Sequence, residues 1–262
     1  MKTPAIAPAF VPASAPAALA TFRERLEHLY ILTQRNAYVF ASPLGPFYHH
    51  EHDHSVPRFV YFGPHTTDAS LRLAFHAGQS AREMNGALAL LYIVERLTEK
   101  PALGCGLNLS FFPLVDVLGA AGTVPVRRLA EEHWGFSAEP EISLLEQEAR
   151  SRGYHGFVVL VSTADEVLTV RLRGAAGAVA EGIDIVDSSD FGGWPVRFEG
   201  ERVEGVKAGP LTVADDLPLA PFEITLGIPA GWPQAEVDAA VAAVLQRFIA
   251  RHAAIQTYAQ HL

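Results

Sequence analysis

Residues 71–92 read LRLAFHAGQSAREMNGALALLY and carry the local signals of a strand, a tight loop and a helix. The apolar run 71–75 predicts a strand, and the apolar spacing after it predicts a helix from about Arg82 to Glu99. Pro101 then stops the helix. The loop between strand and helix ends in a single carboxylate, Glu83. This unit indicates an α/β fold.

The flanking sequence extends the same alternation. Strands are predicted over 37–42, 58–63, 106–117, 157–162 and 222–226, and helices over 19–33, 139–152 and 235–252. Residues 174–221 are rich in Gly, Asp and Pro and are predicted to be an irregular insertion. This order predicts a three-layer α/β/α fold with a mostly parallel, mixed central sheet. We expect a single domain over 19–262, preceded by an extended N-terminal arm over 1–18.

Composition limits the classes of function. A chain of 262 residues, 49% of them hydrophobic, can bury the core of one domain. The formal net charge of -9 disfavours nucleic acid as a partner, and no run approaches the roughly 20 apolar residues that cross a membrane. Cys105 is the sole cysteine, which fits a reducing compartment and predicts a buried structural thiol. We therefore expect a cytoplasmic protein.

Four segments, taken in chain order, carry a recognisable pattern. They are QSARE (79–83), PLVDVLG (113–119) followed by RLAEEHW (128–134), FVVLVST (157–163), and FEITLGIP (222–229). Together they resemble the zinc carboxypeptidase family, especially the branch near succinylglutamate desuccinylase and the murein peptide amidases. The resemblance covers roughly residues 58–254. It implies the α/β fold of that family and, for an intact member, zinc-dependent hydrolysis of peptides or N-acyl amino acids.

The resemblance places non-ligands at two of the three zinc positions. The family motif His-x-x-Glu falls on Ser80 and Glu83, and the last zinc ligand falls on Val161. Catalytic zinc is held by three protein ligands plus water, and valine has no lone pair to donate. Glu83 alone therefore remains of the implied ligand set. We expect no metal at this position and no cofactor.

The positions that align with the substrate-binding residues and the general base of the family also carry other residue types. Asp116 falls on the Asn of the family turn, Ala130 and Glu131 fall on its Asn-Arg pair, and Gly227 falls on its general base. A carboxylate at 131 would repel the substrate carboxylate that the family arginine binds. The resemblance thus implies a vestigial pocket without catalytic residues, formed by Ser80, Arg82, Glu83, Asp116, Ala130, Glu131, Val161 and Gly227. This pattern predicts a pseudoenzyme that binds a small molecule or a protein partner.

A second hypothesis keeps enzymatic activity. In it, His76 replaces a lost ligand and builds a relocated metal site with Glu83 and Asp165, giving a metal-dependent hydrolase. The alternative interpretation of His76 is a hydrogen-bonded core or loop histidine. Glu83 could likewise act as a first-turn carboxylate that interacts with the free amide groups of the helix that follows it.

A third hypothesis rests on the tract HHEHDH at 49–54, which holds four imidazoles and two carboxylates. In an extended strand, His50, His52 and His54 would lie along one edge. Such an edge could bind a metal weakly or share one across a homo-oligomer contact. A solvated surface loop is the alternative.

Overall fold

Strand β5 (Leu71–His76) and helix α2 (Met84–Glu99) form the predicted strand, loop and helix. They belong to a computed structural model that describes residues 15–68, 70–125, 127–129, 138–174, 191, 193–202 and 222–260. Nine residues of α2 are buried, and six of them are consecutive, Gly86 to Leu91, so the first turns of the helix are enclosed on all sides. At Gly86 the helix comes so close to the sheet that an added Cβ would lie 2.9 Å from Leu160 Cβ. The absence of a side chain there permits this approach.

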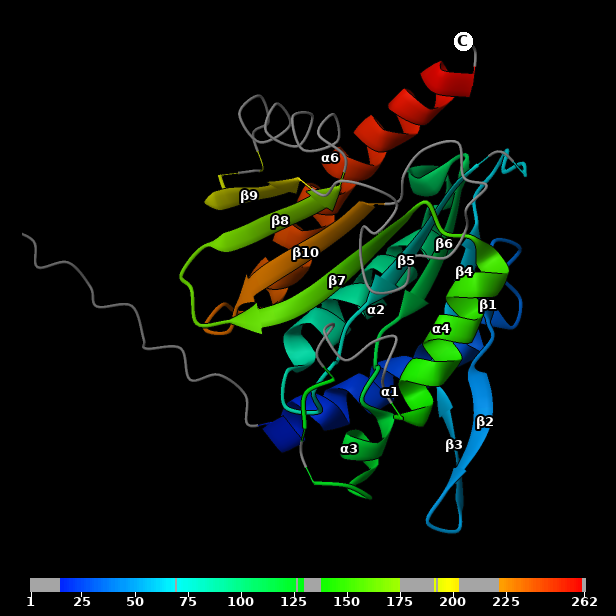
Figure 1. Ribbon diagram of the computed structural model, residues 1–262, viewed down its shortest axis with the longest axis vertical. Helices are drawn as coiled ribbons and strands as arrows, with labels where there is room; N and C mark the ends of the chain where they lie inside the picture. Colours follow the sequence, from blue (N-terminus) through cyan, green and yellow to red (C-terminus); the bar gives the residue numbers. More distant parts are fainter. Residues whose placement is uncertain are drawn as a thin grey trace, which may run out of the picture.

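Eight strands form one mixed sheet in the order β1-β4-β6-β5-β7-β10-β8-β9 (Figure 1). Their bounds are β1 Val39–Ala41, β4 Phe59–Phe62, β6 Leu107–Phe112, β7 Gly156–Thr163, β8 Leu168–Gly174, β9 Val196–Arg202 and β10 Phe222–Pro229. The four central strands β6, β5, β7 and β10 are parallel to one another. The pairs β1–β4, β4–β6 and β8–β10 are antiparallel. The predicted mostly parallel, mixed sheet is confirmed.

Helices cover both faces of this sheet (Figure 1). On one face lie α1 (Ala15–Thr33), α2 and α6 (Gln234–Gln260), and both α1 and α6 pack against α2. On the other face lies α4 (Pro140–Arg152), beside the short helix α3 (Val117–Ala121). A separate hairpin of β2 (Leu44–His49) and β3 (His52–Val56) contacts α4 and α3, and η1 (Pro101–Gly104) ends the α2 segment. The three-layer prediction is confirmed.

Two hydrophobic clusters fill the layers. The larger one joins the inner faces of α1, α2 and α6 to residues such as Phe75, Leu160 and Leu226 on the central strands. The smaller cluster lies under α4 and contains Phe112 and Phe157. Alternate residues of the central strands therefore point into different clusters, as the period of a strand buried on both faces requires.

Several local predictions need correction. Helix α1 begins at Ala15, inside the predicted arm, and β8 and β9 were not predicted as strands. Strand β9 lies within the segment predicted to be irregular. Cys105 is exposed, with Sγ 3.3 Å from the Pro64 carbonyl oxygen, so the prediction of a buried thiol is wrong. Among the described residues, no helix has the length and apolar character needed to span a membrane.

Candidate functional site

The carboxyl ends of β5, β7 and β10 meet at one edge of the sheet, because these three strands are parallel neighbours. His76, at the end of β5, is paired with Val159 of β7. Two residues further along β7, Val161 is paired with Gly227 of β10. The loop 77–83 continues from the same end of β5. This edge is the usual location of a binding site in an open α/β sheet.

Loop 77–83 is held by backbone hydrogen bonds to the segment that follows β6. Gly78 has a φ of +61°, and its carbonyl oxygen accepts a hydrogen bond of 2.9 Å from the Asp116 amide. Ser80 is buried, and its Oγ accepts a hydrogen bond of 3.4 Å from the Arg82 amide. The hydroxyl therefore stabilises a local turn. The Arg82 residue itself is exposed.

Glu83 lies at the N-cap position of α2 without a side-chain cap hydrogen bond. Its carboxylate instead lies 3.6 Å from the guanidinium of Arg128, and the two side chains are 28% and 47% exposed. The Glu83 carboxylate therefore makes no hydrogen bond that caps the first turn of α2. At this exposure the pair contributes at most about 1 kcal/mol to stability.

Asp116 is fully buried and connects three parts of this region. Its carboxylate accepts hydrogen bonds from the amides of Ala81 (3.2 Å) and Gly119 (3.0 Å) and from Arg127 Nε (3.1 Å). It thereby caps α3 and fixes the end of loop 77–83. An added Cβ on Gly119 would lie 2.1 Å from Asp116 Oδ2, so only glycine fits beside this cap.

Arg127 was not singled out from the sequence, yet it is the cationic centre of the network. It bonds the carboxylates of Asp116, Glu139 and Glu141, with Nη2 2.7 Å from Glu141 Oε1. Glu141 is fully buried and also accepts from the Leu118 amide at 3.2 Å. The sequence signal that could have indicated Arg127 is the group of acidic residues near it in the chain, Asp116, Glu139 and Glu141, whose charges an arginine can neutralise. Only the fold brings position 116 to positions 139 and 141.

The space beside Gly227 is filled. An added Cβ would lie 2.9 Å from Thr163 Cγ2 and 3.3 Å from Thr169 Cβ, so a longer side chain would have to displace Thr163. Val161, opposite Gly227, is half-buried and offers only carbon atoms. The predicted positions of a zinc ligand and of a general base are therefore neighbours, and neither carries a functional group.

His76 lies in the core. It is 1% exposed, and its ring centroid lies 4.9 Å from that of Phe112 and 6.2 Å from that of Phe157, with the rings close to parallel. Burial lowers the pKa of His76 from 6.5 to about 3, because the apolar surroundings disfavour the charged imidazolium. The third residue proposed for the relocated metal site, Asp165, is exposed in the turn between β7 and β8.

The histidine tract forms the tip of the β2–β3 hairpin. The chain reverses at His50 and Glu51, whose φ angles are +44° and +66°, so the expectation of an extended strand with His50, His52 and His54 along one edge is wrong. His49 is instead paired with His52, and the ring centroids of His49 and His54 lie 6.4 Å apart. The hairpin is largely exposed.

Zinc chemistry does not fit the donors at the strand edge. Ser80 bonds the backbone, Val161 has no lone pair, and a catalytic zinc site requires three protein ligands. Across the residues that the structure describes, no group of three or more His, Cys, Asp or Glu side chains is placed to hold a metal ion. Two residues of the predicted pocket, Ala130 and Glu131, lie outside those residues.

Comparisons with known proteins identify the fold. A metallo-carboxypeptidase from Burkholderia cenocepacia aligns with a TM-score of 0.66 and 15% identity over 87% of this chain and 68% of that chain. A proposed metallopeptidase from Shewanella baltica aligns with a TM-score of 0.60 and 16% identity over 88% of this chain and 91% of that one. Thrombin activatable fibrinolysis inhibitor aligns with a TM-score of 0.61 and 13% identity over 88% and 73%.

No family model matches the sequence, and no curated protein matches it significantly. The structural likenesses nevertheless show the fold: this chain has the fold of the metallo-carboxypeptidases. The fold expected from the sequence resemblance is confirmed.

Proposed function

We propose that this chain is a catalytically inactive protein with the carboxypeptidase-like fold, and that it acts by binding a small molecule or a protein partner. The observation that carries the proposal is the pairing of Val161 with Gly227, beside Thr163 and Thr169. Where the resemblance implies a zinc ligand, the chain has an isopropyl group. Where it implies a general base, threonine side chains fill the space.

The chemistry of hydrolysis explains why these changes matter together. A catalytic zinc ion lowers the pKa of its bound water, and a nearby carboxylate accepts the proton of that water. Glu83 could supply at most one of the three zinc ligands, and it is paired with Arg128. Neither the hydroxide nor its base can then be supplied by the residues that align with the family motifs.

The remaining network supports retention of a scaffold. Asp116, Arg127 and Glu141 hold loop 77–83, α3 and α4 together through buried, charge-assisted hydrogen bonds. These contacts keep the loop in one conformation, which would give a ligand a preformed surface at the strand edge. We therefore assign the retained function to binding rather than to turnover.

Metal content and hydrolysis test the proposal directly. Tag-free protein is equilibrated with zinc, and bound metal is counted by mass spectrometry. A carboxypeptidase peptide substrate and an N-acyl amino acid are then assayed with and without a chelator. We expect well below one zinc per chain and no turnover that the chelator removes.

The matched variant Ser80→His/Val161→His restores two imidazoles at the implied ligand positions. We expect it to gain zinc while remaining inactive, because position 227 still lacks a carboxylate. Near-stoichiometric zinc in the unmodified chain, with turnover lost in Glu83→Gln, would contradict the proposal and support a metal-dependent hydrolase.

The proposal includes a cytoplasmic location. The sole cysteine of the chain, Cys105, cannot form an internal disulfide, a composition common in reducing compartments. Fractionation of cells that express the full chain tests this location.

A further inference from the structure

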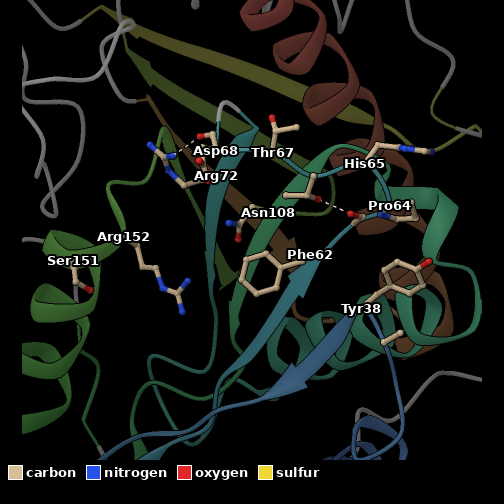
Figure 2. A pocket seen from close by; sticks show the side chains of 13 residues that line it. Tyr38, Phe62, Pro64, His65, Thr67, Asp68, Arg72, Asn108, Ser151 and Arg152 are labelled. Carbon is tan, nitrogen blue, oxygen red and sulfur yellow. Dashed lines mark hydrogen bonds between the residues drawn. The ribbon is translucent and has the colours of Figure 1, made fainter.

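A cavity of about 960 Å³ opens at the amino ends of β5 and β6 (Figure 2). Arg72, the second residue of β5, and Asn108, the second residue of β6, are paired in register and both line it. Because the central strands are parallel, this cavity lies at the opposite end of the sheet from Val161 and Gly227. It is therefore separate from the site described above.

Arg72 is held in place without neutralisation of its charge. Its Nε donates to the Gly153 carbonyl oxygen at 2.9 Å, and its Nη1 donates to the Asp68 carbonyl oxygen at 3.0 Å. None of the ion pairs among the described residues includes Arg72. Its guanidinium is thus ordered by backbone oxygens before any ligand arrives, which reduces the entropy lost on binding.

Arg152, at the end of α4, adds a second positive charge. Its Nε lies 3.0 Å from Glu148 Oε1, and Arg58 pairs with the same carboxylate. The single negative charge of Glu148 therefore pairs with two guanidinium groups, and the three side chains together carry one excess positive charge. Figure 2 shows the Arg152 side chain extending from α4 toward the strand side of the cavity.

The charge of the cavity differs from that of the chain. Two arginines and one aspartate, the exposed Asp68, line it, whereas the whole chain carries a net charge of -9. A cationic concavity on an anionic protein concentrates small anions locally while the surrounding surface repels them. Guanidinium groups suit this role, since their planar donors match carboxylate and phosphate oxygens.

Aromatic side chains continue the same row of the sheet away from Arg72, since Phe62 of β4 is paired with Asn108 of β6, and Asn108 is paired with Arg72 of β5. Figure 2 shows Phe62 and Tyr38 on the strand side of the cavity, with Asn108 between them and the arginines. Phe62 is 36% exposed, and its outer neighbour Phe40 is 44% exposed, with ring centroids 6.2 Å apart. The exposed Phe62 ring is available to stack on a planar ligand, which would also remove apolar surface from water.

We propose that this cavity binds a small anion that carries an aromatic ring. The anionic group lies between Arg72 and Arg152, the ring packs on Phe62, and the Asn108 amide supplies a hydrogen bond between them. An aromatic carboxylate and an aromatic phosphate share this chemistry. The cavity volume accommodates either one.

Calorimetric titration of the full-length protein tests the assignment. Phenyl phosphate and benzoate are the probes, inorganic phosphate lacks the ring, and benzyl alcohol lacks the charge. The variants are Arg152→Gln, which removes one cation, and Phe62→Ala, which removes an exposed ring. Arg128→Gln is the matched control, because Arg128 is an exposed arginine whose ion pair is with Glu83, outside this cavity. Circular dichroism checks that each variant folds.

We expect at least one aromatic anion to bind more tightly than inorganic phosphate and benzyl alcohol. Arg152→Gln should weaken that binding about tenfold or more, and Phe62→Ala should abolish the preference for the aromatic anion over inorganic phosphate. The stronger of the two probes identifies the anionic group. Three results would overturn the proposal: no binding by the unmodified chain up to about 10 mM, equal binding of phosphate with and without the ring, or the same loss in Arg128→Gln as in Arg152→Gln.

Discussion

Val161 on β7 and Gly227 on β10 are paired across two parallel strands, at the edge of the sheet where loop 77–83 begins. The pairing brings together two positions that lie far apart in the sequence, one that the resemblance aligns with a zinc ligand and one that it aligns with the general base. A metal ligand without its base, or a base without its metal, could each survive as a partial activity. Under the proposed function both groups are lost at adjacent positions, and Thr163 and Thr169 occupy the space beside Gly227.

Filling of this space predicts a steric penalty at Gly227. We expect Gly227→Ala to lower the free energy of unfolding by about 1–3 kcal/mol, because the new Cβ would lie 2.9 Å from Thr163 Cγ2. Thr163→Ser removes that methyl group and keeps the hydroxyl. The double variant should therefore lose less than the sum of the single variants, with a coupling of at least about 0.5 kcal/mol in denaturant unfolding. Additive losses would disprove the contact.

The Asp116 cap predicts a graded series of losses. Asp116→Ala leaves two backbone amides without their acceptor and Arg127 without one partner, so we expect a loss of about 2–4 kcal/mol. Asp116→Asn retains one acceptor oxygen and should cost less. Chemical denaturation of both variants measures the difference. Equal losses would mean that charge, rather than acceptance by the carboxylate, holds the loop.

Periodicity and turn residues were sufficient to predict the central fold. The elements β5, α2, α4, β7 and β10 are long or strongly apolar, and each was located within about three residues, whereas the strand predicted over 106–117 runs five residues past the end of β6 and reaches the start of α3. Strand β8, LTVRLRG, was missed although its alternation of apolar and polar residues is the pattern of a half-buried strand. The hairpin was missed because His50 and Glu51 form the two-residue turn, where Asn-Gly is the usual signal.

Less of the candidate site than of the fold could be predicted from the sequence. Motif spacing could suggest which positions align with the zinc-ligand positions of the resembled family, such as Ser80 and Val161. It could not reveal that Thr163 and Thr169 fill the space beside Gly227, because that contact depends on the register of three strands. The cationic cavity was missed for the same reason, since residues 36 positions apart in the chain, Arg72 and Asn108, become neighbours only in the sheet.

Two buried histidines predict acid sensitivity. Burial lowers the pKa of His76 to about 3 and that of His155 to about 4, compared with 6.5 for the ordinary side chain. Below pH 6.5 the unfolded chain therefore binds protons that the folded chain does not, and stability falls as the pH falls toward these values. Each histidine contributes at most about 1.4 kcal/mol per pH unit.

His76→Phe tests the larger shift. We expect the variant to lose stability less steeply than the unmodified chain between pH 6.5 and 4, whatever its stability at neutral pH, because phenylalanine does not titrate. Urea unfolding at several pH values measures the two slopes. Identical slopes would show that His76 is already able to bind a proton in the folded protein, and the imidazole would then again be a candidate ligand.

The hairpin tip predicts a gain in stability. Glu51 has a φ of +66°, a left-handed conformation that side chains with a Cβ adopt at a cost, and the residue is exposed. Glu51→Gly should therefore raise the free energy of unfolding by about 0.5–1 kcal/mol, whereas Glu51→Ala should not, although both remove the same carboxylate. Thermal unfolding of the two variants separates backbone strain from charge. A gain in both would assign the effect to the acidic side chain, and a gain in neither would mean that the turn relaxes in solution.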